Sequence, residues 1–341
     1  MRTLSQRDLL LALLDRQLLL RRSRLPIPAV LERMGGLQAQ YAPSMYVGLW
    51  TRMERFARGD LDAALAERTV VQGTLLRSTI HLVSVDDYWR FAAAIRESRK
   101  QWWLRSRKDT DPAQMDAAVE GLRRYLRTPT RAKEIEQALG TPVMAFNQWV
   151  ELLRVPPSGT WARRRADLYA LAEDWIPPVR VSLAAATEHL VRRYLGAFGP
   201  ATAADIASWA GLSPKQITTA LERMDADLRH YASESGDDLV DLRTAKLPNP
   251  DTPVPVRFLP VWDATMLVHV RRTAILPEEY RTILFNSKNP QSFNTFLVDG
   301  QVAGTWKHTS NAVELSPFKN LSKRTTAALE TEAAGLTALY E

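Results

Sequence analysis

The segment 199–224 carries the pattern that most restricts how this chain can fold. Thr202 is placed to cap a short helix that ends at Gly211, and Ser213 followed by Pro214 begins a second helix. Serine and threonine side chains satisfy the first free amides of a helix, proline fits its first turn, and glycine accepts the left-handed conformation that ends one. A short helix, a glycine turn and a second helix make up a helix-turn-helix motif.

Strand patterns accompany this motif and recur elsewhere in the chain. Segments 228–232 and 238–242 flank a polar turn and predict a hairpin directly after the second helix, which is the wing of a winged helix. A fainter copy of the helix signal, with a threonine cap and a glycine stop, lies at 129–140. Alternating β-branched residues at 70–75 and 78–83 predict another pair of short strands that would form a wing.

These repeats predict a mainly α-helical chain with small β wings, an α+β fold made of tandem winged-helix modules. At 341 residues the chain is long enough for two or three small domains that each bury a core. A strand-like segment with an Asp-Gly turn at 295–306 predicts a hairpin of a different kind. The expected parts are an N-terminal winged-helix unit at 1–125, a second at 126–185, a third at 186–250, and a C-terminal β-hairpin region with a closing helix at 251–341.

Positive charge is clustered along the chain. Lysine and arginine number 45 against 38 aspartate and glutamate residues, so the formal net charge is +7. Cationic clusters suit a phosphate backbone, because each neutralised phosphate releases a counterion, whereas a single cluster can also be a solvated helix face. The four clusters are Arg21, Arg22 and Arg24; Arg96, Arg99, Lys100, Arg105, Arg107 and Lys108; Arg123, Arg124, Arg127, Arg131 and Lys133; and Arg163, Arg164 and Arg165.

The chain contains no cysteine and only five scattered histidines. Disulfides, thiolate nucleophiles, iron–sulfur clusters and cysteine-ligated zinc are therefore excluded, and no histidine pair has the spacing of a metal-binding motif. We expect neither a metal nor a cofactor. The N-terminus lacks the plan of a signal peptide, and no apolar run approaches the roughly 20 residues of a membrane span. The sequence thus predicts a soluble cytoplasmic protein that does not contact a membrane.

The segment 35–44 is the strongest candidate for chemistry. Gln38 and Gln40 follow a Gly-Gly break and precede Pro43. A glutamine amide both donates and accepts hydrogen bonds, so two of them can hold one water molecule from two sides. A hydrolase that must aim water at an electron-poor carbon without a strong base needs this arrangement. The alternative is that both amides satisfy backbone groups left free by the break.

With these pieces in place, nearly the full length of the chain resembles the AlkZ/YcaQ family of winged-helix DNA glycosylases. The Gln-x-Gln element at Gln38 and Gln40 is typical of the AlkZ branch, since the YcaQ branch has Gln-x-Asp. The segments that carry the resemblance are Leu37-Gln38-Ala39-Gln40-Tyr41-Ala42-Pro43-Ser44, Arg77-Ser78-Thr79-Ile80-His81-Leu82-Val83, Leu259-Pro260-Val261-Trp262-Asp263 and the late hairpin at 297–306.

The resemblance implies tandem winged helices in a C shape with a basic concave channel for duplex DNA. It also implies excision of bulky N7-alkylated purines, including the unhooking of interstrand crosslinks left by DNA-alkylating antibiotics, for repair or self-resistance. Gln38 and Gln40 would then be the catalytic pair. No lysine lies beside them to form a Schiff base, so hydrolysis without strand cleavage is expected. Asp263 would either orient a basic side chain or cap local backbone.

Six further residues are candidate DNA contacts. His81 alternates onto the same predicted strand face as Thr79, where it would contact a phosphate or the lesion strand; a hydrogen bond within its own domain is the alternative. Because a crosslinked base cannot be flipped freely, we expect lesion access through hairpin and groove contacts. The C-terminal candidates are Arg271 and Arg272 for phosphates and Gln301 and Lys307 for a groove.

Two other functions compete with the glycosylase. A winged-helix transcription regulator would place the helix 214–224 in a major groove and read sequence without catalysis. Such regulators usually dimerise through a dedicated helix, and none stands out, so three winged units suit a monomer that wraps one duplex. A resistance protein that only sequesters a small alkylator is a third reading, against which the cationic clusters argue.

Overall fold

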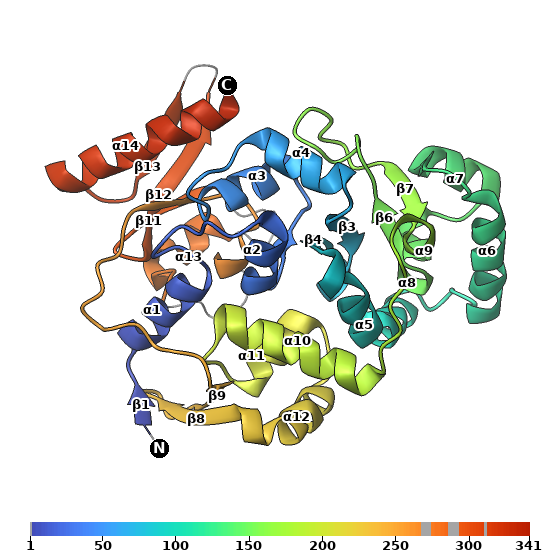
Figure 1. The fold of residues 1–341 in the computed structure, drawn as a ribbon, viewed down its shortest axis with the longest axis horizontal. Coiled ribbons are helices and arrows are strands. Elements are labelled where there is room, and N and C mark those ends of the chain that lie inside the picture. The colour runs from blue at the N-terminus through green and yellow to red at the C-terminus, as the bar shows by residue number, and fades with distance from the viewer. Residues whose placement is uncertain (1, 267–273, 286–292, 310–311) are drawn as a thin grey trace.

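The computed structural model describes residues 2–266, 274–285, 293–309 and 312–341, and the expected mainly helical fold with small sheets is confirmed (Figure 1). The described helices are α1 (Gln6–Arg16), α2 (Ile27–Met34), α3 (Ala42–Trp50), α4 (Arg58–Ala66), α5 (Val85–Ser106), α6 (Pro112–Tyr125), α7 (Ala132–Leu139), α8 (Val143–Trp149), α9 (Ala172–Trp175), α10 (Leu183–Phe198), α11 (Ala203–Ala210), α12 (Pro214–Arg223), α13 (Glu278–Leu284) and α14 (Lys323–Tyr340). The described strands are β1 (Arg2–Leu4), β2 (Leu37–Gln38), β3 (Val70–Thr74), β4 (Ile80–Ser84), β5 (Thr130–Arg131), β6 (Leu152–Arg154), β7 (Leu168–Leu171), β8 (Leu228–Ser233), β9 (Asp238–Leu242), β10 (Arg257–Leu259), β11 (Thr295–Val298), β12 (Gln301–His308) and β13 (Val313–Pro317).

One topology occurs three times along the chain. Each copy consists of a helix, a short strand or bridge, two more helices, and an antiparallel hairpin whose second strand pairs with the first short strand, which is the order of a winged helix. In the third copy the short strand is a single bridge between Ala201 and Val240. The copies are α2-β2-α3-α4-β3-β4, α6-β5-α7-α8-β6-β7 and α10-α11-α12-β8-β9.

The helix-turn-helix expected at 199–224 forms for local reasons that the sequence contains. Thr202 caps α11 through a reciprocal pair of hydrogen bonds with Asp205, and Gly211 ends this helix in the left-handed conformation at φ 70°. Ser213 and Gln216 form the same reciprocal cap at the start of α12. Two capped helices around a left-handed glycine need no long-range contact to set their turn.

The wings of the first two copies join into one six-stranded sheet in the order β2-β4-β3-β6-β7-β5. The seam is the antiparallel pair β3–β6, in which Gly73 faces Leu153. A Cβ on Gly73 would lie 2.6 Å from Tyr88 Cε2, so α5 can approach the sheet this closely only over a glycine. Helix α6, which precedes the predicted boundary at residue 125, shares a hydrophobic cluster with α7 and α8; the four-part division stays a prediction.

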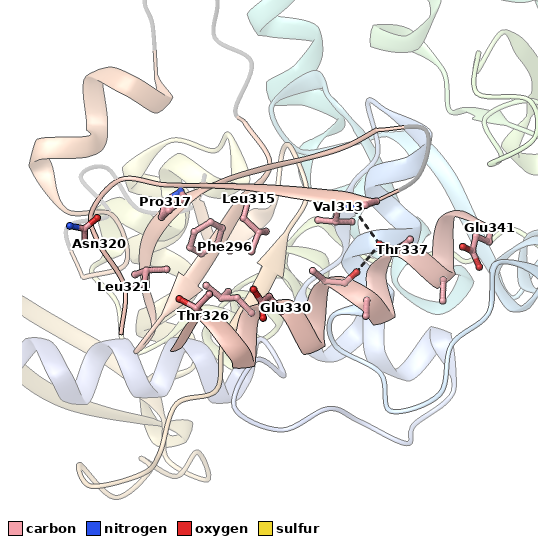
Figure 2. A pocket seen from close by; sticks show the side chains of 15 residues that line it. Phe296, Val313, Leu315, Pro317, Asn320, Leu321, Thr326, Glu330, Thr337 and Glu341 are labelled. Carbon is pink, nitrogen blue, oxygen red and sulfur yellow. Dashed lines mark hydrogen bonds between the residues drawn. The ribbon is translucent and has the colours of Figure 1, made fainter. Parts of the chain in front are cut away.

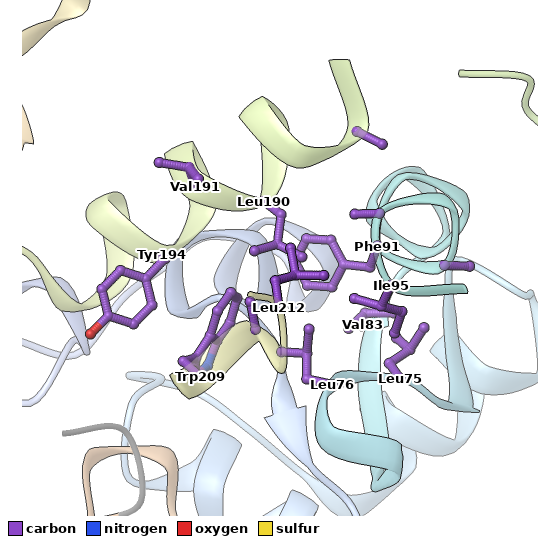
Figure 3. Packing of buried hydrophobic residues seen from close by; sticks show 14 of the residues in the cluster. Leu75, Leu76, Val83, Phe91, Ile95, Leu190, Val191, Tyr194, Trp209 and Leu212 are labelled. Carbon is purple, nitrogen blue, oxygen red and sulfur yellow. The ribbon is translucent and has the colours of Figure 1, made fainter. Parts of the chain in front are cut away.

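A single large hydrophobic core binds the third copy to the first. Helices α5 and α10 contribute Phe91 and Tyr194, and Trp209 of α11 lies between them, with ring centroids 6.1 Å from Phe91 and 5.2 Å from Tyr194 (Figure 3). Leu76 and Val83 from the first wing pack into the same cluster. The helix-turn-helix is therefore held against the first wing by packed apolar side chains.

The C-terminal region forms a four-stranded antiparallel sheet, β10-β11-β12-β13, against which α14 packs. The expected Asp-Gly turn joins β11 to β12, with Asp299 and Gly300 both at positive φ. Gly300 approaches α1 so closely that a Cβ would lie 2.7 Å from Leu14. Between β13 and α14 lies a groove of about 730 Å³ whose walls are mostly apolar, including Leu315 and Leu329 (Figure 2).

A fully buried ion pair ties this region to the first winged helix. Arg52, just beyond α3, donates two hydrogen bonds of 2.9 Å to the two carboxylate oxygens of Asp263, and both side chains are 0% exposed. The Arg52 guanidinium also donates to the carbonyls of Gln17 and Gly48, while Asp263 accepts from Thr265. Asp263 thus fills both roles considered for it, since it orients a basic side chain and caps local backbone.

We expect Asp263→Ala to lower the free energy of unfolding by about 3–5 kcal/mol, because it leaves the Arg52 charge buried without a counterion. Urea unfolding of the purified variant measures this. The joint change Arg52→Met with Asp263→Ala should recover part of the loss. The control Glu54→Ala breaks the exposed pair with Arg24 and should leave the urea midpoint unchanged. An Asp263→Ala midpoint equal to that of the wild type would contradict a structural role for the pair.

Candidate functional site

The Gly-Gly break sets the direction of the strand that carries the glutamines. Gly35 ends α2 in the left-handed conformation at φ 73°, and Gly36 follows at φ 83°. A Cβ on Gly36 would lie 2.8 Å from Val83 Cγ1, so the chain passes β4 with no room for a side chain. Leu37 is buried in the core of the first copy. Because successive side chains alternate across a strand, Gln38 takes the opposite face of β2.

The side chains of Gln38 and Gln40 are in direct contact. Gln38 Nε2 donates a hydrogen bond of 2.9 Å to Gln40 Oε1. Gln38 is 7% exposed, whereas Gln40 is exposed at the end of the strand. Between them the amide of Ala39 donates to the Ile80 carbonyl, which holds the segment on β4. This hydrogen bond between the two amides fixes their relative orientation. Gln38 Oε1 and the second lone pair of Gln40 Oε1 can each still accept a hydrogen bond.

His81 is the cross-strand neighbour of Gln38 and is 4% exposed. Its Nδ1 lies 3.0 Å from the Thr79 carbonyl oxygen. A carbonyl only accepts, so this contact places the proton on Nδ1 and makes Nε2 the acceptor nitrogen. Burial lowers the pKa of His81 to about 3, and the positive charge of Arg77 adds to the effect. His81 is therefore a neutral imidazole beside the glutamine pair at ordinary pH.

The turn before His81 has a left-handed backbone at two residues that are not glycine. Arg77 has φ 52° and Ser78 has φ 57°, conformations that are rare for residues with a side chain. The Arg77 guanidinium donates to the Trp209 carbonyl of α11, and Ser78 Oγ donates to Gln148 of α8. Thr79 Oγ1 donates to the Leu76 carbonyl and thereby closes the turn. Contacts to both other winged copies therefore fix the approach to His81.

Two of the four C-terminal candidates, Gln301 and Lys307, fall within the described residues, and they do not lie together. Gln301 lies beside the turn that packs on α1, and its side chain donates to the Ala274 carbonyl at 3.3 Å. Lys307 stands about 20 Å farther along β12, six residues at ~3.3 Å each. Its Nζ is 2.8 Å from Glu314 Oε2. Arg271 and Arg272 fall outside the described residues.

Several cations of the four clusters serve the fold. Arg99 is 4% exposed and pairs with Glu151, as does Arg96. Arg22 pairs with Glu332 and stacks over Trp50 at 4.8 Å. These arginines therefore have a structural role rather than a free charge for DNA. A count of basic residues in the sequence overstates the positive charge available at the surface.

A small pocket next to Gln40 was not anticipated from the sequence. It has a volume of about 370 Å³ and lies where α3, the loop before β7, the end of β12 and α14 converge. Its signals in the sequence are Tyr41, which directly follows the glutamine pair, Arg164 in the fourth basic cluster, and Lys307, one of the candidate groove contacts. The lining residues are Tyr41, Pro43, Ser44, Val47, Trp161, Arg164, Pro260, Asn294, Lys307, His308 and Tyr340.

The described residues contain neither a metal-binding cluster nor a membrane-spanning helix. No group of three or more histidine, cysteine, aspartate and glutamate side chains there is arranged to hold a metal ion. No helix there is both long and apolar enough to cross a membrane.

Comparison with known proteins gives a family and a fold. The family model described as DNA glycosylase AlkZ-like matches residues 31–339, a range that includes Gln38, Gln40 and His81. The solved structure of Streptomyces sahachiroi DNA glycosylase AlkZ is similar to this fold with a TM-score of 0.84 at 19% sequence identity, and the match covers 99% of this chain and 96% of that chain. No curated protein sequence matches the chain.

The low pKa of His81 makes stability depend on pH in a defined window. Between about pH 6.5, the ordinary value for histidine, and about pH 3, the unfolded chain binds a proton that the folded protein does not. Lowering the pH through this window should therefore reduce the free energy of unfolding through His81, by up to about 1.4 kcal/mol per pH unit. Urea unfolding of wild type and His81→Gln from pH 7 to pH 4.5 should give a steeper slope for the wild type. Equal slopes would show that His81 titrates alike in both states.

Proposed function

The chain belongs to the AlkZ-like DNA glycosylase family, and we propose that it hydrolyses the N-glycosidic bond of N7-alkylated purines in duplex DNA. The observation that carries this proposal is the hydrogen-bonded pair of Gln38 and Gln40 at the edge of the first wing, beside the neutral His81. Three polar groups without charge meet there, at a surface that DNA can reach through the exposed Gln40.

Neutral groups suit this reaction because the substrate supplies the charge. An N7-alkylated purine is cationic, so its base already leaves readily, and C1′ of the sugar becomes oxocarbenium-like as the bond breaks. The enzyme then has to place a water molecule and stabilise the developing positive charge, which is positioning and electrostatics. Gln38 Oε1 and Gln40 Oε1 would accept the two hydrogens of the water and turn its lone pair toward C1′. As the N-glycosidic bond breaks, its electron pair goes to the base, which leaves neutral, and the water oxygen bonds C1′. The proton of that water is released to bulk solvent, because the lowered pKa of His81 makes it a poor acceptor.

The hydrolysis is proposed to be monofunctional. A glycosylase that also cleaves the strand uses an amine to form a Schiff base with the sugar. The chain has no lysine before Lys100, and the Nζ of Lys307, which lines the pocket next to Gln40, lies 2.8 Å from Glu314 Oε2 as an ion pair, so neither supplies a free amine to the glutamine pair. Water is the remaining nucleophile, and the product is an abasic site in an uncut strand.

We propose further that the protein acts as a cytoplasmic monomer on bulky or crosslinked adducts of DNA-alkylating antibiotics, with duplex DNA in a basic concave channel. Thr79 and His81 would face the lesion strand, and Gln301 and Lys307 would enter a groove. The family match favours this function over a regulator that reads sequence with α12, because membership assigns an enzyme to the chain.

The proposal predicts release of free base from duplex DNA that carries a single N7-methylguanine. Gln38→Ala and Gln40→Ala should each slow this release by about 100-fold or more, the loss typical of removing one preorganised polar group from an active site. Single-turnover release of 7-methylguanine measures it. Gln137→Ala is the matched control, because it removes an exposed glutamine from α7 in the second copy.

The outcomes of this assay separate the alternatives. If the wild type releases no base from either N7-methylguanine or a bulky crosslinked adduct, the proposed activity is contradicted. Sequence-dependent DNA binding would then favour a regulator. Wild-type release that survives in both variants would contradict the assignment of the glutamine pair. Strand cleavage without added base would contradict monofunctional hydrolysis.

A second prediction concerns the arginines outside the described residues. Reversing both charges, with Arg271→Glu and Arg272→Glu, should weaken binding to undamaged duplex DNA and flatten its salt dependence, because phosphate contacts are lost. Fluorescence anisotropy at several KCl concentrations measures both quantities. Unchanged affinity would remove these residues from the interface.

A further inference from the structure

The small pocket next to Gln40, hereafter the Tyr41 pocket, is lined by aromatic rings and by cations. His308 and Tyr340 stack face to face with centroids 3.9 Å apart and 10° between their planes, and Trp161 meets Tyr340 edge-on at 4.9 Å. Tyr41 lines the same pocket and is 43% exposed. Arg164 donates to Tyr41 Oη at 3.3 Å. These side chains come from four distant parts of the chain, so the pocket exists only in the folded protein.

Its walls are held in place by bonds beneath them. The amide of Trp161 donates to Tyr46 Oη of α3 at 3.0 Å, and Tyr46 in turn donates to Asp62 of α4. Arg58 lies over the Trp161 ring at 5.1 Å and donates to the Tyr340 carbonyl. The aromatic wall is thus preformed, which lowers the entropic cost of binding a ligand against it.

The charges of the pocket favour an anionic ligand. Arg164 and Lys307 are the two cations on its lining, and no described lining residue is acidic. Burial raises the pKa of Tyr340 to about 12, so its phenol carries no negative charge. Arg164 gives one of its five donors to Tyr41, and the Lys307 ammonium has three donors of which Glu314 needs one. Both cations therefore keep donors for a phosphate.

We propose that the Tyr41 pocket binds a single unstacked nucleotide of the DNA, with its base against the aromatic side chains and its phosphate between Arg164 and Lys307. A planar ring and a phosphate are the two groups that aromatic platforms beside cations recognise in unpaired nucleic acid. At about 370 Å³ the pocket is at the small end of the range for ligand sites, which suits one nucleotide rather than several. Its lining residue Tyr41 directly follows Gln40 in the chain, so a nucleotide bound in the pocket would hold the DNA strand next to the glutamine pair. The inference rests on the proposed action on DNA.

The base-binding half of the proposal is tested on DNA without a lesion, so that no chemistry intervenes. Affinities of full-length wild type and Tyr41→Ala are measured by fluorescence anisotropy on a fully paired duplex and on the same duplex with one unpaired nucleotide. Tyr41→Ala should weaken binding to the unpaired-nucleotide duplex about tenfold, as expected for a lost base stack, and leave the paired duplex unaffected. Tyr125→Ala, at 42% exposure against 43% for Tyr41, is the matched control.

The phosphate-binding half is tested by salt dependence. Arg164→Ala and Lys307→Ala should each reduce the slope of log K against log salt on the unpaired-nucleotide duplex by about 0.9, the value for one phosphate contact. Arg180→Ala, which removes an exposed arginine outside the four clusters, should leave the slope unchanged. Equal effects of Tyr41→Ala on both DNAs, or slopes that do not move, would overturn the proposal.

The binding tests and the base-release assay fail independently. If Tyr41→Ala no longer distinguishes the unpaired-nucleotide duplex from the paired duplex and the wild type releases no base, the nucleotide pocket is supported and the glycosylase chemistry is rejected. If the wild type releases base and Tyr41→Ala still distinguishes the two duplexes, the glycosylase chemistry is supported and the nucleotide pocket is rejected.

Discussion

The ion pair between Arg52 and Asp263 joins the first winged copy to the C-terminal region at a point where both charges are shielded from water. Arg52 follows α3, and the residues just before α3 are Gln40 and Tyr41. Two buried charges are tolerable only together, so the C-terminal region cannot leave α3 without a large electrostatic cost. The position of β12, and with it Lys307, relative to Gln40 therefore depends on this contact.

The shared sheet provides the second constraint. Gln38, His81, Gly73 and Leu153 face one another in one row across β2, β4, β3 and β6. The row runs from the candidate site, through the glycine that admits Tyr88, into the second winged copy. Because the register of a sheet fixes which face every side chain takes, a slip of one residue between β2 and β4 would remove Gln38 from the side of His81. The first two winged copies thus act as one scaffold for a site at its edge.

The electrostatic character of the site follows from the same packing. His81 is buried beside Arg77 and stays neutral, and the two amides next to it carry no charge. A neutral cluster does not attract DNA, so affinity has to come from cations elsewhere, of which Arg164 and Lys307 border the adjoining pocket. The proposed binding and the proposed chemistry would thus be carried out by neighbouring but different side chains.

The sequence by itself determined the local elements. The caps at Thr202 and Ser213, the stop at Gly211 and the alternation of the wings are short-range signals, and the Gln-x-Gln segment was found from its own spacing and its resemblance to a family. The pairing of β3 with β6 and the convergence of Tyr41, Trp161 and Tyr340 were decided by tertiary structure alone. These contacts join residues 80 or more positions apart, and no local pattern encodes which strand edge or which ring a distant segment will meet.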